Sequence, residues 1–294
     1  MNRSHERGSP DSRQRRHHRA DALESPPERE TAASSAPCPP VSLVLPTYNE
    51  VQNLPRLIPR LTSVLEREGV PFEIIVVDDD SPDGTWALAG EMALADRRLR
   101  VIRRRGERGL ATAVVAGWNA AQGEILGVMD ADLQYPPEGL PALLRVMVAD
   151  GAVDVVVASR YAPGAQMGPW SLRREITSRA AILLAKLALP RTLGQLRDPN
   201  AGYFLIRRRV IEGIDLQPLG YKILIEVLAR GRWQRMVEIP HPYEGRHEGA
   251  SKLGSRQIAQ FVSHLAWLAW DTRVKRPWSR IRRAAPHRGE SRPR

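Results

Sequence analysis

Short apolar runs alternate with helix-like segments between residues 41 and 160, and this alternation limits the folds that the chain can adopt. The candidate buried strands are Val41–Leu45, Ile74–Val77, Val101–Ile102, Ile125–Met129 and Val153–Ala158. Helices are expected between them, over Asn53–Leu65, Thr85–Ala95, Leu110–Ala121 and Gly139–Val148. Apolar strands separated by helices predict an α/β fold, with a mostly parallel sheet that is covered by helices on both faces.

Polar residues directly follow four of these strands. They are Thr47-Tyr48-Asn49-Glu50, Asp78-Asp79-Asp80-Ser81, Asp130 with Asp132, and Ser159-Arg160. Ligands of open α/β sheets bind outside the carboxyl ends of the strands. We therefore expect these four groups to line one rim of the sheet and to form the functional site.

Beyond Arg160 the alternation is less regular. Helices are expected over Ile176–Leu189, Ile223–Ala229 and Ile258–Trp270, and strands over Tyr203–Ile206 and Arg235–Ile239.

Asp130 and Asp132 are two residues apart directly after a strand. Extended backbone would turn both carboxylates to the same side, where they can share a hard divalent cation such as Mg²⁺ or Mn²⁺. Mg²⁺ commonly completes its coordination with substrate phosphates and water, so the pair suggests a nucleotide diphosphate held at the rim. Short acidic motifs also arise by chance, and this pair alone leaves that alternative open.

Seven motifs in this order resemble those of the family-2 glycosyltransferases, which have the GT-A fold. They are Val44–Glu50, Val76–Thr85, Met129–Pro137, Ser159–Tyr161, Asp198–Phe204, Gly220–Glu226 and Gly249–Leu253. Within that family the chain is similar to the dolichol-phosphate and polyprenol-phosphate mannose synthases, over about residues 41–270. The resemblance implies a nucleotide-sugar donor, GDP-mannose in the first place, and a polyprenyl or dolichyl monophosphate acceptor.

The resemblance also implies roles for individual positions. Nucleotide binding falls on Pro46, Tyr48, Glu50, Val77 and Asp79. The metal and diphosphate group falls on Asp130, Ala131, Asp132 and Gln134, of which Ala131 would act through its backbone. Basic positions associated with the phosphates of donor and acceptor are Arg160, Arg173, Arg246 and Lys252. Guanidinium groups suit that task because they bind phosphate oxygens in a bidentate way.

Several residues near these positions also have an ordinary structural interpretation. Glu50 can begin a helix, and Asp78 and Asp80 are typical turn or capping residues. Arg174 stands beside Arg173, and either can face the phosphate. The remaining arginines at this rim are interpreted as a solvated face, and they are Arg103, Arg104, Arg105 and Arg108. For Arg108, which precedes Gly109, contact with the donor is the open alternative.

The expected reaction is an inverting transfer of a hexose to a phosphate monoester. The second pKa of such an ester is about 6, so the acceptor is a nucleophile at neutral pH without a general base. Asp132, Arg173 and Arg246 would carry the catalysis, with a metal ion on Asp130, Asp132 and Gln134. The alternative is a family-2 enzyme using UDP-glucose or a UDP-N-acetylhexosamine, for polyprenyl phosphate or for a glycan acceptor. A hydroxyl acceptor needs a base, for which Glu226 is the obvious candidate, although we favour a structural role for it.

The net charge of +11 is unevenly distributed. Residues 271–294 carry a net charge of +7, whereas residues 41–270 carry +3. A nucleic-acid-binding protein usually spreads basic charge over its folded surface. We therefore expect a basic tail that meets anionic lipid, and no nucleic-acid partner.

The helices expected at Ile176–Leu189 and Ile258–Trp270 are too short to span a bilayer but suit its interface. Trp267, Trp270 and Trp278 would lie at headgroup depth. The alternative for Ile258–Trp270 is an ordinary packed helix.

The expected organisation has four parts. Residues 1–40 are a disordered extension, 41–245 the glycosyltransferase domain, 246–270 an acceptor loop with an amphipathic helix, and 271–294 a disordered basic tail. Cys38 is the only cysteine, which fits a reducing compartment. The expected location is cytoplasmic, peripheral on the inner face of the membrane.

Overall fold

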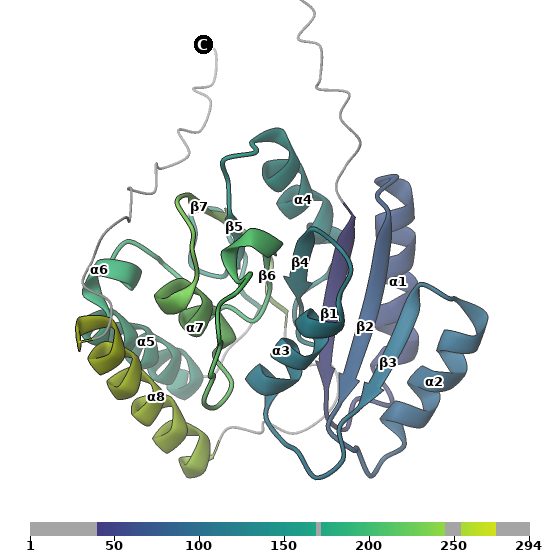
Figure 1. The fold of residues 1–294 in the computed structure, drawn as a ribbon, viewed down its shortest axis with the longest axis horizontal. Coiled ribbons are helices and arrows are strands. Elements are labelled where there is room, and N and C mark those ends of the chain that lie inside the picture. The colour runs from purple at the N-terminus through teal and green to yellow at the C-terminus, as the bar shows by residue number, and fades with distance from the viewer. Residues whose placement is uncertain (1–39, 169–171, 245–253, 275–294) are drawn as a thin grey trace, which may run out of the picture. The chain divides into compact units, whose positions relative to one another are not determined.

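A computed structural model describes residues 40–168, 172–244 and 254–274. These residues form a seven-stranded sheet with the strand order β3-β2-β1-β4-β6-β5-β7 (Figure 1). The strands are β1 (Val41–Thr47), β2 (Phe72–Asp78), β3 (Leu99–Arg103), β4 (Ile125–Val128), β5 (Val155–Ser159), β6 (Phe204–Arg207) and β7 (Met236–Pro240). The α/β fold class predicted from the sequence is confirmed.

Helices connect the strands and cover the sheet. They are α1 (Leu54–Arg67), α2 (Thr85–Ala95), α3 (Leu110–Ala120), α4 (Leu140–Ala149), α5 (Leu172–Ala188), α6 (Pro190–Leu193), α7 (Ile223–Arg230) and α8 (Ser255–Val274). Two short 3₁₀ helices are η1 (Pro137–Gly139) and η2 (Arg208–Val210).

The sheet is parallel except for β6, which runs antiparallel to both of its neighbours. Val128 at the end of β4 lies opposite Phe204 at the start of β6. The segment that precedes β6 therefore lies at the same edge as the segment that follows β4. This reversal brings a further stretch of chain to the predicted rim.

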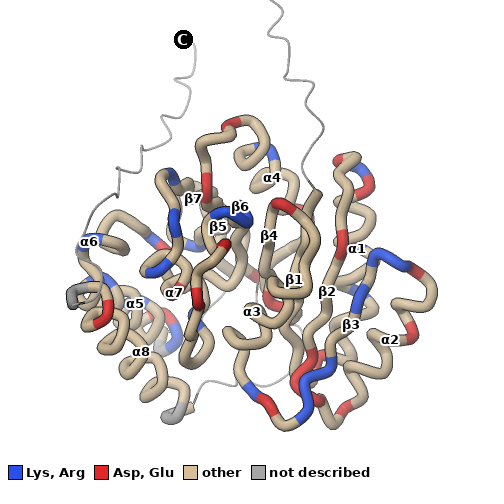
Figure 2. The backbone as a smooth tube through the Cα atoms, in the orientation of Figure 1, with Lys and Arg blue, Asp and Glu red and all other residues tan. Residues whose placement is uncertain are grey.

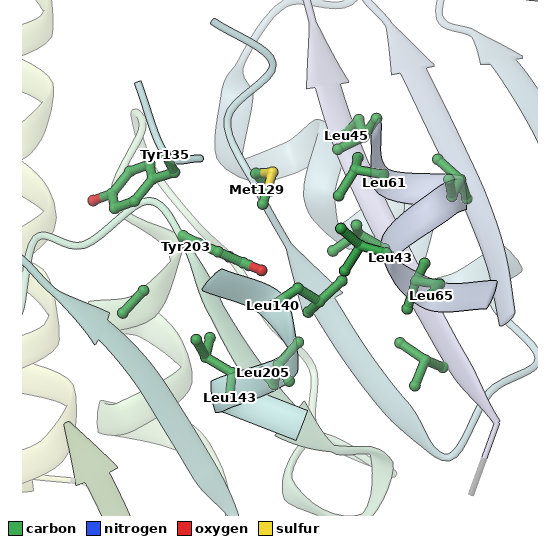
Figure 3. Packing of buried hydrophobic residues seen from close by; sticks show 14 of the residues in the cluster. Leu43, Leu45, Leu61, Leu65, Met129, Tyr135, Leu140, Leu143, Tyr203 and Leu205 are labelled. Carbon is green, nitrogen blue, oxygen red and sulfur yellow. The ribbon is translucent and has the colours of Figure 1, made fainter. Parts of the chain in front are cut away.

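Successive residues of the central strands pack against opposite faces of the sheet. Leu43 and Leu45 of β1 belong to a core with helices α1 and α4, part of which is shown in Figure 3. Val44, between them, packs with Val114 and Trp118 of α3 in a second core. Burial on both faces accounts for the continuous apolar runs in the sequence.

The last helix is longer than the sequence suggested. Helix α8 continues to Val274, four residues into the segment expected to be a disordered tail. Asp271 and Thr272 are buried, Asp271 pairs with Arg230 of α7 at 3.2 Å, and the Thr272 hydroxyl donates to the carbonyl of Leu268. The rest of the expected tail and the extension 1–39 lie outside the described residues.

None of the helices within the described ranges combines the length and the apolar character needed to cross a bilayer.

Candidate active site

The carboxyl ends of β1 and β2 lie side by side, with Thr47 opposite Asp78. The amide of Met129, just after β4, donates to the carbonyl of Val44 on β1, so the chain leaves β4 at the same edge. Figure 2 shows acidic and basic residues gathered below the ends of β1, β2 and β3. The predicted rim is therefore present.

Asp78 is a structural residue of this rim. It is fully buried, accepts from the Thr47 hydroxyl at 2.8 Å, and accepts from the amide and the hydroxyl of Ser81 at 2.8 and 2.6 Å. Asp80 has a φ of +55°, in the left-handed region, and pairs with Arg103 at 2.6 Å. The interpretation of both acids as turn and capping residues is confirmed.

Asp79 lies between these two acids and is bound on both carboxylate oxygens. Oδ1 accepts from Nε of Arg104 at 2.7 Å, and Oδ2 accepts from the amide of Gly109 at 2.7 Å. Arg104 is buried and also donates to Thr112 and to the carbonyl of Gly109. The interpretation of Arg104 as part of a solvated face was wrong, because its charge is neutralised by Asp79. The pair fixes the loop that leads into α3.

The other residues assigned to the nucleotide lie along the ends of β1 and β2. The guanidinium of Arg108 lies 4.3 Å from the ring centroid of Tyr48, a cation–π arrangement at an aromatic surface suited to a base. Glu50 binds the Asn53 side chain at 2.6 Å, and its carbonyl accepts from the amide of Leu54 at the start of α1. This geometry fits a role in beginning the helix.

Pro46 and Val77 face each other in register on β1 and β2. Both are buried, and Val77 is completely so.

The acidic group after β4 adopts a different backbone from the one expected. Strand β4 ends at Val128 and the chain bends from Ala131, so extended geometry does not explain how Asp130 and Asp132 are oriented. Burial raises the pKa of the Tyr243 hydroxyl, and Asp132 and Asp130 raise it further because both negative charges lie near it.

Close approach of the backbone supports this acidic group. A side chain at position 202 would collide with the Asp130 carboxylate, which only Gly202 accommodates. Gly202 belongs to the segment that the antiparallel strand β6 brings to the rim.

Gln134 is buried and bound at each polar atom of its side chain. Its Oε1 accepts from the Tyr243 hydroxyl at 2.8 Å and from Arg174 at 3.2 Å, and its Nε2 donates to the carbonyl of Glu244 at 3.3 Å. The backbone amide of Gln134 donates to the carboxylate of Asp132 at 3.2 Å. Gln134 therefore lies beside the acidic pair, as the resemblance implied.

Two carboxylates and one amide oxygen are the hard ligands that Mg²⁺ and Mn²⁺ prefer. The residues present therefore fit a divalent cation. Across the described parts of the chain, no group of three or more His, Cys, Asp or Glu side chains is arranged to hold a metal. A metal site at this rim would therefore depend on two carboxylates, Asp130 and Asp132, and on the side-chain amide oxygen of Gln134.

The four basic residues that the resemblance associated with phosphate groups do not all lie in the described part of the chain. Arg160 is buried and forms a bidentate pair with Asp198, with both nitrogen–oxygen distances at 2.7 Å. Arg173 lies on α5 but its side chain is outside the described part, whereas its neighbour Arg174 reaches Gln134. Arg246 and Lys252 lie outside the described residues.

Lys222 and Tyr243 are site residues that the sequence reasoning did not assign. Nζ of Lys222 donates to the carbonyl of Asn200 at 2.7 Å. Burial and the neighbouring Arg160 lower the pKa of Lys222 to about 8, against the opposing effect of Asp130. The motif Gly220–Glu226 contained Lys222, but nothing local marked it as a rim residue.

A cluster of aromatic rings packs beside Tyr243. The ring centroids of Tyr135 and Tyr243 are 4.8 Å apart, and those of Tyr135 and His241 are 5.7 Å apart. Burial lowers the pKa of His241, which keeps its imidazole neutral at neutral pH. His241 is thus a packing residue beside the site.

Comparison with known proteins identifies the class. Residues 42–215 match glycosyl transferase family 2. The chain belongs to this family and is a glycosyltransferase. The motifs, the mostly parallel sheet and the acidic group at its rim agree with that assignment.

Within the family the chain is similar to the dolichol-phosphate and polyprenol-phosphate mannose synthases. A dolichol-phosphate mannosyltransferase from Pyrococcus furiosus is 40% identical over 237 residues, which span 80% of this chain and 66% of that relative. A polyprenol monophosphomannose synthase from Mycolicibacterium smegmatis is 36% identical over 246 residues, spanning 81% of this chain and 89% of the relative.

Solved structures show the same fold at lower identity. Glucosyl-3-phosphoglycerate synthase from Mycobacterium tuberculosis, in complex with Mn²⁺, uridine diphosphate and phosphoglyceric acid, aligns with a TM-score of 0.56 at 19% identity. The alignment covers 79% of this chain and 78% of that chain.

Proposed function

We propose that this enzyme transfers mannose from GDP-mannose to a polyprenyl or dolichyl monophosphate with inversion at the sugar carbon. The observation that carries the proposal is the polar group at the rim, where the backbone amide of Gln134 donates to Asp132 and the side-chain oxygen of Gln134 accepts from Arg174. The names of the similar mannosyltransferases support the sugar and the acceptor.

In this reaction an oxygen of the acceptor phosphate forms a bond to the anomeric carbon. The bond from that carbon to the nucleotide diphosphate breaks, and the electron pair leaves with the diphosphate. No proton has to be removed from the acceptor, because a phosphate monoester with a second pKa of about 6 is already ionised at neutral pH. The task of the chain is therefore to hold two anionic groups close together.

The described residues supply this environment. Arg174 and Lys222 bring positive charge to the rim, and Tyr48 offers an aromatic surface for the base. A Mg²⁺ or Mn²⁺ ion on Asp130, Asp132 and Gln134 would neutralise charge on the departing diphosphate. The solved structure with Mn²⁺ and uridine diphosphate supports the use of a divalent metal in this fold.

The position of Glu226 argues against the alternative with a hydroxyl acceptor, for which Glu226 was the candidate general base. That carboxylate is fully buried and binds the amide of Gln217 and Nε2 of His264, each at 2.8 Å. Arg230 lies 2.9 Å from it as well. A buried carboxylate with these partners is suited to structural support. A general base would instead have to contact the hydroxyl of the acceptor.

The experiment is a donor panel. Purified full-length protein with Mg²⁺ or Mn²⁺ and a polyprenyl phosphate is given labelled GDP-mannose, UDP-glucose or a UDP-N-acetylhexosamine. Label is expected in the organic phase with GDP-mannose. Label in that phase only with a UDP-sugar would replace the donor, and no labelled lipid with any donor would refute the proposal.

We also propose that an apolar surface on α5 and α8, here called the apolar face, lies in the membrane interface. The two helices contact each other and lie side by side in Figure 1. The exposed large apolar side chains of the face are Leu172, Ile176, Leu183, Leu184, Leu187, Ile258, Val262 and Trp270. Exposed apolar surface of this extent is typical of a lipid or protein contact.

Lipid is the favoured occupant for two reasons. Helix α5 also carries Arg174, so the apolar face and the site that would receive the phosphate of a lipid acceptor share one helix. Nine basic residues follow Thr272 in the sequence, and each near an anionic surface contributes about 1 kcal/mol of attraction. The enzyme would thus be peripheral on the cytoplasmic face of the membrane.

Charge on the apolar face should weaken membrane binding. The double variant Leu183→Asp with Leu187→Asp changes side chains that are 59% and 68% exposed, so the fold should tolerate it. We expect binding to phosphatidylglycerol-containing vesicles, measured by co-sedimentation, to fall by about tenfold or more. Leu94→Asp on α2, at a side chain 88% exposed, is the matched control and should bind like wild type. Equal binding by the double variant would contradict the membrane assignment.

A further inference from the structure

The amide oxygen of Gln134 is shared between two donors of different kinds. The neutral hydroxyl of Tyr243 donates at 2.8 Å and the cationic guanidinium of Arg174 donates at 3.2 Å. An amide oxygen has two lone pairs. Both are engaged in the described arrangement.

A divalent cation that used this oxygen would require one of those lone pairs. One donor must then leave. Arg174 carries a positive charge that a divalent cation repels, whereas the hydroxyl of Tyr243 is neutral. Electrostatics therefore selects Arg174 as the donor that is displaced.

The two donors are also held differently. Tyr243 is buried, its ring packs against Tyr135, and its backbone is bonded on both sides, from its amide to Gln166 and from the amide of Gly168 to its carbonyl. Arg174 is an exposed residue in the first turn of α5, so water can solvate its guanidinium when it leaves Gln134.

We propose that Tyr243 is a positioning residue that aims the Gln134 amide oxygen at the Asp130–Asp132 pair, and that Arg174 occupies this oxygen until a divalent cation displaces it. The inference rests on the proposed function, because it concerns the proposed metal site. Tyr243 and Arg174 therefore affect cation affinity in opposite directions through one atom. The displaced guanidinium stays at the rim, where phosphate groups would gather.

The test is a titration of the full-length protein with Mn²⁺ in the absence of substrates, with free Mn²⁺ measured by electron paramagnetic resonance. Tyr243→Phe keeps the ring and removes the hydroxyl, and it is expected to weaken Mn²⁺ binding about tenfold, as loss of a group that orients a ligand commonly does. Arg174→Ala removes the competing donor and is expected to tighten binding about fivefold.

Two matched variants control for burial and charge. Tyr203→Phe removes a buried hydroxyl without a hydrogen-bond partner from the same aromatic cluster. Arg179→Ala removes one positive charge from the same helix, at a residue paired with Glu175. Both controls should bind Mn²⁺ within about twofold of wild type, because an exposed charge farther along the helix is screened.

The outcomes separate the two proposals. If wild type does not bind Mn²⁺, or if Asp132→Asn binds it equally well, the proposed metal site fails and the inference fails with it. If wild type binds, Asp132→Asn does not, and Tyr243→Phe and Arg174→Ala behave like their controls, only the inference is overturned. Weaker binding by Arg174→Ala would also overturn its role as a competitor.

Discussion

Replacement of Asp132 by asparagine is expected to reduce the formation of labelled lipid at least about 100-fold, because the variant would bind less tightly the divalent cation whose positive charge would stabilise the leaving diphosphate. The side chain is only 6% exposed, and it lies with Asp130 near the Tyr243 hydroxyl. Two like charges in one place destabilise each other. The variant should therefore melt at the same temperature as wild type or higher, which separates loss of chemistry from loss of fold.

Asp215→Asn is the matched control for this variant. Asp215 is an exposed acid that accepts a hydrogen bond from the side-chain amide of Gln217. Its replacement should leave transfer within about twofold of wild type, as is usual for a surface substitution. Turnover by Asp132→Asn at the wild-type rate would remove Asp132 from the metal site and from catalysis.

Replacement of Glu226 by glutamine is expected to lower the free energy of unfolding by about 3 kcal/mol. The carboxylate is fully buried between α7 and α8, where it faces Arg230 at 2.9 Å and His264 at 2.8 Å. When Glu226 is neutral, the buried guanidinium of Arg230 keeps one carboxylate partner among the described residues, Asp271 at 3.2 Å. The loss corresponds to a fall in melting temperature of about 6–12 °C.

The same variant distinguishes a structural carboxylate from a general base. Transfer per folded molecule, measured below the melting transition, should stay within about threefold of wild type if Glu226 only supports the fold. Removal of a general base would reduce it about 100-fold or more with little change in stability. Glu212→Gln, at an exposed acid, controls for the loss of one negative charge. A large kinetic loss at unchanged melting temperature would favour the hydroxyl-acceptor alternative.

Local patterns predicted the strands and the rim because apolar runs and strand ends are visible within short windows of sequence. The orientation of β6 was not predictable in this way, since Tyr203–Ile206 reads alike in either direction. That orientation places Asp198 against Arg160 and Gly202 against Asp130. The general location of the candidate site was therefore easier to predict than its contacts.

The contacts at Gln134 and Asp79 show the same limit. The Tyr243 hydroxyl that binds Gln134 comes from 109 residues farther along the chain. Arg104 resembles the neighbouring arginines in sequence, and only the approach of Asp79 from the end of β2 makes it a buried ion. Such pairings depend on the way the chain returns to the rim, which a single sequence does not display.

The buried polar pairs that join α8 to α7 have a consequence for how the enzyme would rest on a bilayer. His264 and Asp271 on α8 bind Glu226 and Arg230 on α7, so separation of α8 would leave these buried groups without their partners. Helix α8 is therefore a packed part of the folded domain and not a flexible membrane anchor. With the apolar face immersed to a fixed depth, the rim would stand at a constant height relative to the lipid headgroups, and the phosphate of a lipid acceptor would have to meet it at that height.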